Sequence, residues 1–237
     1  MLELDRLRIV QGAFVLEADL AVGRGSKVAV IGPSGAGKST LLLAIAGMIL
    51  PDSGRIRWDG MDLADTPPGK RPVTILFQDQ NLFPHLSVAD NVGLGLSPSL
   101  HLTVEDREAV DGALARTGLE GLGERKPGTL SGGQQSRVAI ARALLRARPL
   151  MLLDEPFAAL GPALKEEMLA LVGSVAAETG ATVLTVSHDP EDAIGFADEV
   201  ILVANGVATP PSPTQALFAD PPEALRDYLG AAGRKRL

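Results

Sequence analysis

Residues 28–40 read VAVIGPSGAGKST, and this short run combines a strand, a glycine-rich loop and the start of a helix. The four apolar residues 28–31 predict a strand that is buried on both faces. The apolar run 41–50, which Pro51 closes, predicts a helix after the loop. A buried strand, a tight loop and a helix in this order indicate an α/β fold.

The loop fits the pattern G-x-x-x-x-G-K-[ST] from Gly32 to Ser39 without a mismatch. Its glycines let successive N–H groups point inward as a nest for an anion, and the helix adds the positive end of its dipole. The Lys38 ammonium can reach the β- and γ-phosphates, and the Ser39 hydroxyl can ligate Mg²⁺. The residues expected to bind a nucleoside triphosphate are Gly32, Pro33, Ser34, Gly35, Ala36, Gly37, Lys38, Ser39 and Thr40.

Composition argues against several other kinds of site. The chain has 237 residues, of which 46% are hydrophobic, and this is enough for a sizeable core. A net charge of −7 argues against a broad face that binds nucleic acid. Because there is no cysteine, there is no disulfide, thiolate metal site or cysteine nucleophile. The longest apolar run is too short for a membrane span and the first ten residues lack signal-peptide features, so we expect a soluble cytoplasmic protein.

Apolar and alternating runs predict the order of the other strands. Residues 2–10 and 14–22 alternate loosely and predict an antiparallel pair ahead of the phosphate-binding loop. Further strands are expected at 55–58, 73–77, 150–153 and 182–186, and a short hairpin at 200–203 and 206–209. The sequence thus predicts a P-loop nucleoside triphosphatase core with a mainly parallel sheet and an N-terminal antiparallel β subdomain.

Helical signals replace strand signals after residue 81. Thr103 and Asp106 have the spacing of a capping box, and apolar residues at helical spacing predict a helix from Ser131 to about Arg146. We interpret residues 81–148 as a helical subdomain that is inserted into the α/β core.

A single domain is expected over residues 1–230. Its catalytic core would comprise about 1–80 and 149–230, on either side of the helical subdomain 81–148. Near the end, Asp189-Pro190 is typical of a helix start, and the last helix is expected to end near Leu229. Residues 231–237 form a basic tail.

Leu130-Ser131-Gly132-Gly133-Gln134 is a second candidate anion site. Ser131 could simply cap the helix that it begins, as serine often does. A serine hydroxyl and glycine N–H groups at a helix start also form an anion site. From these residues alone both interpretations stay open.

With this motif the chain resembles the ATP-binding subunits of ABC transporters. The resemblance covers nearly the whole chain and rests on motifs in a fixed order: GPSGAGKST at 32–40, Gln78 after an apolar strand, LSGGQ at 130–134, LMLLDEP at 150–156, and Ser187-His188-Asp189. Lys38 and Gln78 are 40 positions apart, and Glu155 and His188 are 33 apart.

The resemblance implies a role for each motif. Asp154 would hold Mg²⁺, and Glu155 would act as the general base or orient the water that attacks the γ-phosphate. His188 matches the switch histidine that bonds the γ-phosphate, Gln78 would bridge Mg²⁺ and the water, and Lys38 joins them as a catalytic residue.

The LSGGQ motif implies a homodimer. In the family it serves the nucleotide that the other subunit's phosphate-binding loop holds. Ser131, Gly132, Gly133 and Gln134 would therefore contact the ATP of a second copy, and two copies would close around two ATP molecules.

Two positions depart from the family pattern. Family members usually carry an aromatic residue that stacks on adenine in the loop after the first strand, but residues 10–13 here read VQGA. Phe14 could replace that aromatic residue or could be a core strand residue. Gly161 stands where the family usually has an aspartate that communicates across the dimer.

Residues 77–102, FQDQNLFPHLSVADNVGLGLSPSLHL, look most like the ATPase subunits of bacterial thiamine importers. This resemblance implies ATP-powered import of thiamine or its phosphates, with integral membrane permease subunits and, indirectly, a periplasmic or extracellular substrate-binding protein. It places the chain at the cytoplasmic face of the inner membrane as a peripheral subunit. Leu82, Phe83 and Leu86 could line a groove for a permease helix or pack within the helical subdomain.

Other functions explain less of the sequence. Importers of ferric iron, sulfate or polyamines use nearly identical ATPases, so another small solute is the first alternative. A DNA-repair ATPase with the same head usually carries a long coiled coil, but only 52 residues lie between Gln78 and Ser131 and none form a heptad run. A phosphate-loop kinase would leave LSGGQ and His188 unexplained.

Overall fold

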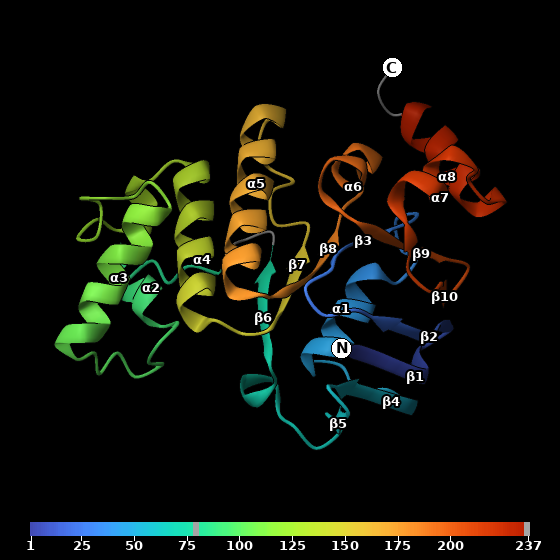
Figure 1. Cartoon of the computed structure of the whole chain (residues 1–237), viewed down its shortest axis with the longest axis horizontal. Coiled ribbons are helices and arrows are strands. Elements are labelled where there is room, and N and C mark those ends of the chain that lie inside the picture. The colour runs from blue at the N-terminus through green and yellow to red at the C-terminus, as the bar shows by residue number, and fades with distance from the viewer. Residues whose placement is uncertain (78–80, 235–237) are drawn as a thin grey trace. The chain divides into compact units, whose positions relative to one another are not determined.

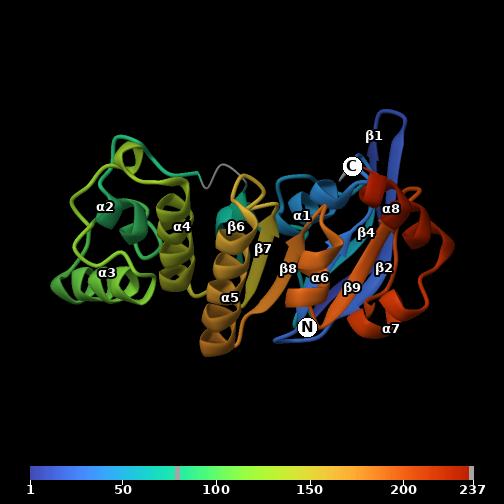
Figure 2. The same cartoon turned by 90° about the horizontal axis from the view of Figure 1, so that it is seen from above.

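A computed structural model describes residues 1–77 and 81–234 of the chain, with side chains described as far as Gly230. The chain forms two compact units, whose elements are labelled in Figures 1 and 2. The first unit comprises Met1–Val73 and Thr182–Leu237, and the second comprises Thr74–Ala181.

An antiparallel sheet begins the first unit, as the sequence predicts. Strands β1 (Leu2–Gln11) and β2 (Phe14–Val22) pair from Leu2 opposite Val22 to Gln11 opposite Phe14. On the other side of β1 lie β4 (Ser53–Trp58) and then β5 (Met61–Asp62). The β1 residues that face the interior are buried leucines and an isoleucine, so this sheet covers part of the core.

Parallel strands form the rest of the sheet in this unit. Strand β3 (Lys27–Ile31) lies between β8 (Thr182–Val186) and β9 (Glu199–Ala204) and is parallel to both. Residues 28–31 are completely buried, which confirms the prediction of a strand covered on both faces. The predicted hairpin is also present, because β10 (Val207–Ala208) pairs antiparallel with β9; β10 also pairs with β2, and the short β11 (Ser212–Pro213) pairs with β9.

Helix α1 (Lys38–Ala46) follows the glycine-rich loop and ends earlier than the sequence predicts. The apolar run continues to Leu50, but Gly47 adopts a left-handed conformation with φ of 81° and closes the helix. Two of the residues after Gly47 are exposed, Met48 and, at 72% exposure, Leu50. The apolar run therefore predicted the helix correctly but overestimated its length.

Arg71 fastens the carboxyl end of α1. Its side chain is 1% exposed, and it follows the short 3₁₀ helix η1 (Pro68–Lys70). The guanidinium donates to the carbonyl oxygens of Ala44, Ile45, Leu63 and Thr66 at 2.8–3.0 Å. Burial lowers the pKa of Arg71, but the cation lies at the negative end of the helix dipole, where positive charge is stabilised.

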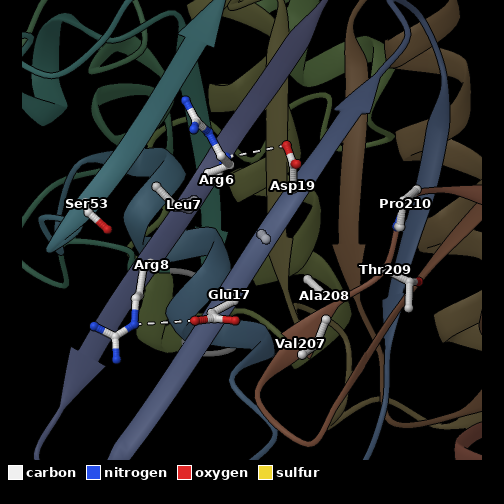
Figure 3. A pocket seen from close by; sticks show the side chains of 11 residues that line it. Arg6, Leu7, Arg8, Glu17, Asp19, Ser53, Val207, Ala208, Thr209 and Pro210 are labelled. Carbon is white, nitrogen blue, oxygen red and sulfur yellow. Dashed lines mark hydrogen bonds and ion pairs between the residues drawn. The ribbon is translucent and has the colours of Figure 1, made fainter.

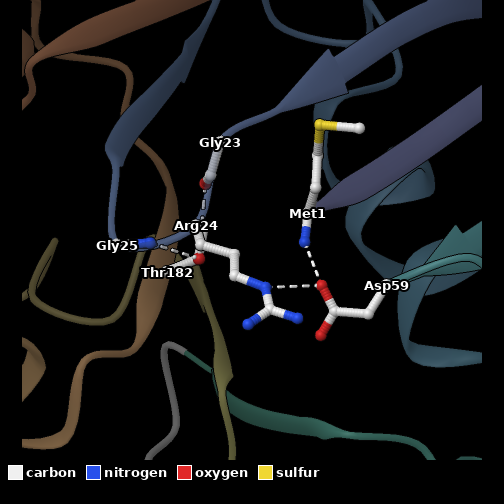
Figure 4. A network of polar contacts seen from close by, with 6 residues as sticks. All are labelled: Met1, Gly23, Arg24, Gly25, Asp59 and Thr182. Carbon is white, nitrogen blue, oxygen red and sulfur yellow. Dashed lines mark hydrogen bonds and ion pairs between the residues drawn. The ribbon is translucent and has the colours of Figure 1, made fainter.

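Asp59 links its own turn to the first residue of the chain and to the turn before β3, all in the same unit (Figure 4). Its carboxylate accepts hydrogen bonds from the ammonium group of Met1 and, at 2.7 Å, from Nε of Arg24. The bond from the Met1 ammonium is the main cause that lowers the pKa of Asp59, and Arg24 adds to it. Close by, the Gly25 N–H donates to the Thr182 hydroxyl at 2.9 Å, which ties the turn before β3 to the start of β8.

Three further helices complete the first unit: α6 (Pro190–Phe196), α7 (Thr214–Ala219) and α8 (Glu223–Arg234). Figures 1 and 2 show α1 and α6 on opposite faces of β3, β8 and β9. Asp189 caps α6, as the sequence predicts. The last helix continues to Arg234 rather than ending near Leu229: Gly230 does not stop it, and the two alanines that follow favour a helix.

The described part of the second unit contains two strands and a group of helices. Strands β6 (Val73–Phe77) and β7 (Leu150–Asp154) are neighbours. The helices are α2 (Val88–Gly93), α3 (Val104–Arg116), α4 (Gly132–Arg146) and α5 (Pro162–Thr179), with the short 3₁₀ helix η2 (Pro127–Thr129) before α4. Helices α2, α3 and α4 pack against one another, and α4 also packs against α5.

The expected absence of strands in the helical part is confirmed for the residues described between 81 and 148. The capping box at Thr103 and Asp106 is present, with both side-chain bonds formed. A second box, which the sequence analysis did not name, joins Ser87 and Asp90 at the start of α2. None of the helices in the described residues is long and apolar enough to cross a bilayer.

Candidate nucleotide-binding site

The glycine-rich loop leaves the carboxyl end of β3 and requires glycine at two positions. Gly32 has φ of 148°, and a Cβ atom there would lie 1.9 Å from the carbonyl oxygen of Val203 in β9. Gly37 has φ of 104° and forms the N-cap of α1 without any side chain. The loop can therefore curl tightly between the sheet and the helix, as an anion nest requires.

Lys38 is the first residue of α1 and is only 7% exposed. Its ammonium group donates to the carbonyl oxygens of Gly32 and Pro33, both at 2.9 Å. The positive charge thus lies against the loop itself, while the neighbouring Ser39 is exposed. A cation, the N–H groups of the loop and the amino end of α1 together form a site suited to phosphate.

Phe14 contacts the phosphate-binding loop. Its ring is so close to Gly37 that a Cβ atom on Gly37 would lie 2.6 Å from the ring carbon Cζ. Phe14 is the first residue of β2 and is half-buried, so it is a strand residue that also touches the loop. The adjacent turn approaches α1 as well, because the Thr40 hydroxyl lies 3.5 Å from the Gln11 side-chain oxygen.

His188 lies at the same edge of the sheet as the phosphate-binding loop. Strands β3 and β8 are parallel, with Val30 opposite Val186, so the loop after β3 and the segment after β8 both leave from carboxyl ends. The Ser187 N–H donates to the carbonyl oxygen of Val30 at 3.4 Å. His188 is exposed, and its carbonyl oxygen accepts a hydrogen bond from the hydroxyl of Tyr228 at 2.6 Å.

Asp154 and Glu155 lie at the end of β7 in the second unit. Asp154 is the last strand residue, and both side chains are half-buried. Glu155 has φ of 47°, in the left-handed region that residues with a side chain rarely adopt. Such strain persists where the surrounding structure enforces it and is concentrated at functional sites.

The LSGGQ segment begins α4 with a complete capping box. The Ser131 hydroxyl accepts from the Gln134 N–H at 3.3 Å, and the Gln134 side-chain oxygen accepts from the Ser131 N–H at 3.0 Å. Ser131 and Gly132 are exposed. Gly133 is buried, and a Cβ atom there would lie 2.6 Å from Cδ2 of Leu164 in α5. Capping and exposure are compatible, so the segment can cap its helix and still meet a ligand.

Other predicted positions are placed as follows. Gln78 lies outside the described residues. Gly161 is the N-cap of α5 without a side-chain bond, and a Cβ atom there would meet nothing within 4 Å. In the second unit Leu82 and Leu86 are half-buried while Phe83 is 47% exposed. Phe83 therefore has the exposure that a contact residue needs.

Two of the residues predicted to hold Mg²⁺ lie among those described, Ser39 in the first unit and Asp154 in the second. Among the described residues no three histidine, cysteine or carboxylate side chains gather as a cage for a metal ion. The oxygen atoms of Ser39 and Asp154 are hard donors, which Mg²⁺ prefers, and this ion commonly takes its other ligands from phosphate and water.

A pocket of about 450 Å³ lies elsewhere in the first unit, over β1, β2 and β10 (Figure 3). Two polar contacts lie in its lining: Nε of Arg8 is 3.4 Å from the Glu17 carboxylate, and the backbone N–H of Arg6 donates to the Asp19 carboxylate. None of its lining residues is a predicted site residue. It therefore adds nothing to the nucleotide site.

Sequence reasoning missed two residues that support the first unit's part of the site. Tyr228, the single tyrosine, holds the backbone of His188, and Arg71 holds the far end of α1. Neither residue belongs to a motif. Only the fold brings Tyr228 to a residue 40 positions away.

Comparisons with known proteins agree on the family. The family model described as ABC transporter matches residues 15–158. A thiamine import ATP-binding protein of Cereibacter sphaeroides is 66% identical over 97% of this chain and all of its own length. A protein of the same description from Ruegeria sp. (strain TM1040) is 58% identical over 98% of this chain and all of its own length. Another from Brucella suis is 50% identical over 97% of this chain and 95% of its own length.

Among solved structures, an ATP-binding cassette protein is similar to this chain. That protein was solved as a dimer in a post-hydrolysis state, bound to ADP and phosphate. The two share 31% sequence identity with a TM-score of 0.76, over 90% of this chain and 99% of the other.

Proposed function

This chain belongs to the ABC transporter family, and we propose that it hydrolyses ATP to power the import of thiamine or its phosphates. The observation that carries the proposal is the 66% identity, over the relative's full length, to a thiamine import ATP-binding protein. The phosphate-binding loop supports the ATP part of the proposal independently, because its geometry and its buried lysine suit a polyphosphate.

We assign ATP binding to the first unit because its glycine-rich loop and its lysine suit phosphate groups. The loop from Gly32 to Thr40 would surround the phosphates with N–H groups, and Lys38 would exchange its bonds to loop carbonyls for bonds to phosphate oxygens. Phe14, which already touches Gly37, would lie beside the nucleotide base. Mg²⁺ bound with the nucleotide would neutralise phosphate charge, and the oxygen atoms of Ser39 and Asp154 would hold it.

Hydrolysis is assigned to three residues. Glu155 would accept the proton of the attacking water or orient that water, and its strained backbone supports a functional role. His188 would donate to the γ-phosphate and hold the water in line. Gln78 would contact the same water. Positioning and charge stabilisation of this kind account for most of the catalysis in phosphoryl transfer.

A homodimer is the proposed active form. The exposed Ser131 and Gly132 would bind the γ-phosphate of ATP held by a second copy, with Gly133 and Gln134 completing the contact. The similarity to a protein solved as a dimer with hydrolysis products supports this assembly. ATP would then bridge two copies, and hydrolysis would release them from each other.

Membrane partners follow from the import function. We assign the chain a peripheral place at the cytoplasmic face of the inner membrane, bound to integral permease subunits. A substrate-binding protein outside would deliver thiamine to the permease, so the ATPase would never contact the cargo. Phe83, exposed beside the buried start of α2, is a candidate contact for a permease helix.

The test is the ATPase rate of the chain co-purified with its permease, measured with thiamine-loaded binding protein. We expect thiamine-dependent stimulation, and loss of about 100-fold or more of the rate in Glu155→Gln. Stimulation by another cargo alone would support the assignment as an importer ATPase and overturn thiamine as its cargo. Stimulation by DNA without a membrane partner would overturn the transporter.

A further inference from the structure

Tyr228 joins the last helix of the chain to the segment that carries His188. Its hydroxyl donates to the carbonyl oxygen of His188 at 2.6 Å, a short bond between residues 40 positions apart. We propose that Tyr228 is a positioning residue for His188 in ATP hydrolysis. This inference rests on the proposed function, because it assumes that His188 acts on the γ-phosphate.

The phenol is held firmly by its own helix. Tyr228 is 7% exposed and Leu225, one turn earlier in α8, is completely buried. The Leu225 N–H donates to the Pro222 carbonyl oxygen at 2.9 Å and so fixes the start of the helix. A tyrosine with a buried ring and a bonded hydroxyl has little freedom to move.

The residues on both sides of His188 are held by local hydrogen bonds. The Asp189 N–H donates to the Ser187 hydroxyl at 3.0 Å, and that hydroxyl donates to the Asp192 carboxylate. The Asp189 carboxylate accepts from the Glu191 N–H at 3.1 Å. These contacts all lie within six positions of one another. The bond from Tyr228, by contrast, ties His188 to a distant part of the fold.

The bond acts on the imidazole through the backbone. The carbonyl group of His188 belongs to the peptide plane that follows its Cα atom, so the direction of this carbonyl sets the ψ angle of His188. The side chain leaves the same Cα atom, and the residue is exposed rather than packed in the core. A fixed peptide plane therefore restricts where the imidazole can lie, and small misplacements in a catalytic site reduce the rate strongly.

Tyr228→Phe removes the hydroxyl and keeps the ring. Because a single hydrogen bond contributes modestly to holding a geometry, we expect kcat to fall about three- to tenfold. The KM for ATP should change by less than about twofold, since the phosphate-binding loop and Lys38 are untouched.

Thr214→Val is the matched control. The Thr214 hydroxyl donates to the Ala197 carbonyl oxygen at 2.7 Å, and the residue is 4% exposed. This bond, like that of Tyr228, joins a buried hydroxyl to a backbone carbonyl in the first unit, but it does not touch the His188 segment. A loss of stability should therefore be similar in the two variants, while kcat should fall in Tyr228→Phe alone.

The full chain would be assayed as wild type, Tyr228→Phe, Thr214→Val and His188→Ala. Equal kcat in Tyr228→Phe and Thr214→Val would overturn the inference. If the wild type fails to hydrolyse ATP, or if His188→Ala keeps full activity, the proposed function of the site fails instead. The two failures are thus separable.

A second measurement needs no substitution. Tyr228 is the chain's single tyrosine, so biosynthetic 3-fluorotyrosine gives one fluorine signal. A phenol that holds the His188 segment should change its chemical shift when ATP and Mg²⁺ are added to the full chain. An unchanged signal at saturating ATP would contradict the inference, because a purely structural tyrosine would not respond to nucleotide.

Discussion

Glu155 combines a proposed catalytic role with an unfavourable backbone. Its φ of 47° brings Cβ close to the following carbonyl group, which costs an L-residue about 1–2 kcal/mol. Glycine would avoid this cost but would carry no carboxylate. The chain therefore accepts strain at the position where the proposed chemistry needs an acid.

Glu155→Gly separates activity from stability at this residue. Relief of strain and the added freedom of glycine nearly cancel, so the free energy of unfolding should stay within about 0.5 kcal/mol of the wild type. The ATPase rate should fall about 100-fold or more. The control Glu166→Gly, at an exposed position within α5, should lose about 1 kcal/mol. Denaturant unfolding measures the free energy of unfolding of both variants. A larger loss of stability in Glu155→Gly than in Glu166→Gly would contradict the strain argument.

At the residue scale the sequence identified motif residues but not their supports. The loop from Gly32 to Ser39 could be predicted because its chemistry fixes both residue types and spacing. Tyr228 and Arg71 could not, because each acts through a contact that only the folded chain creates. The strain at Glu155 leaves no trace in the sequence either.

Among the elements, α1 carries the phosphate-binding loop and depends on a buried cation at its other end. The last carbonyl groups of a helix lack partners within the helix, and a buried end must find them elsewhere. Arg71 supplies them for Ala44 and Ile45, and it also holds the segment around Leu63 and Thr66. Its guanidinium is thus shared between a helix and a loop.

Arg71→Met should destabilise the chain by about 2–4 kcal/mol, because the Ile45 carbonyl loses its Arg71 donor and those of Ala44 and Leu63 each lose one of two donors. Affinity for ATP should weaken too, since α1 would be less firmly held. Lys70→Met removes a neighbouring cation that is exposed, and it should change stability by less than about 0.5 kcal/mol. Thermal unfolding measures the stability of both variants, and nucleotide titration measures their affinity for ATP. Equal effects of the two variants would show that Arg71 does not stabilise the end of α1.

Element type was more predictable than element length. The strands at 73–77 and 182–186 have the predicted bounds, because short buried runs between turns are well delimited. Helix α1 was overextended, since a left-handed Gly47 ended it within an apolar run. The sequence analysis did not identify α5. Its buried residues Met168, Val172, Val175 and Ala176 have helical spacing, but apolar residues on its other faces blur that pattern.

For the whole molecule, Asp59 shows how distant segments are joined by charge. It brings together the first residue of the chain, the turn before β3 and the turn between β4 and β5. These groups are exposed, so salt should weaken their attraction. Since the pKa of Asp59 is lowered in the folded chain, its carboxylate favours folding above the ordinary aspartate pKa.

Asp59→Asn should therefore lower the Tm near neutral pH. The difference from wild type should shrink as pH falls through the lowered pKa of Asp59, where the wild-type carboxylate takes up a proton. Asp65→Asn, at an exposed aspartate of the same unit, should leave the Tm unchanged at both pH values. A Tm gap in Asp59→Asn that does not depend on pH would contradict this account.

On this scale the sequence indicated the family and the fold, because the motifs occur in a fixed order from residue 32 to residue 189. The connection of the antiparallel sheet to the parallel strands through β10 could not be foreseen, since two residues carry too weak a pattern. The division into the units Met1–Val73 with Thr182–Leu237 and Thr74–Ala181 was also not evident, because no linker composition marks it.

The most direct test is uptake of labelled thiamine by proteoliposomes that contain the chain with its permease, with ATP on the side of the ATPase. The account predicts accumulation that requires ATP and thiamine-loaded binding protein, and none with Glu155→Gln. Accumulation that continues in Glu155→Gln, or a complex that hydrolyses ATP and accumulates a different solute but no thiamine, would contradict it.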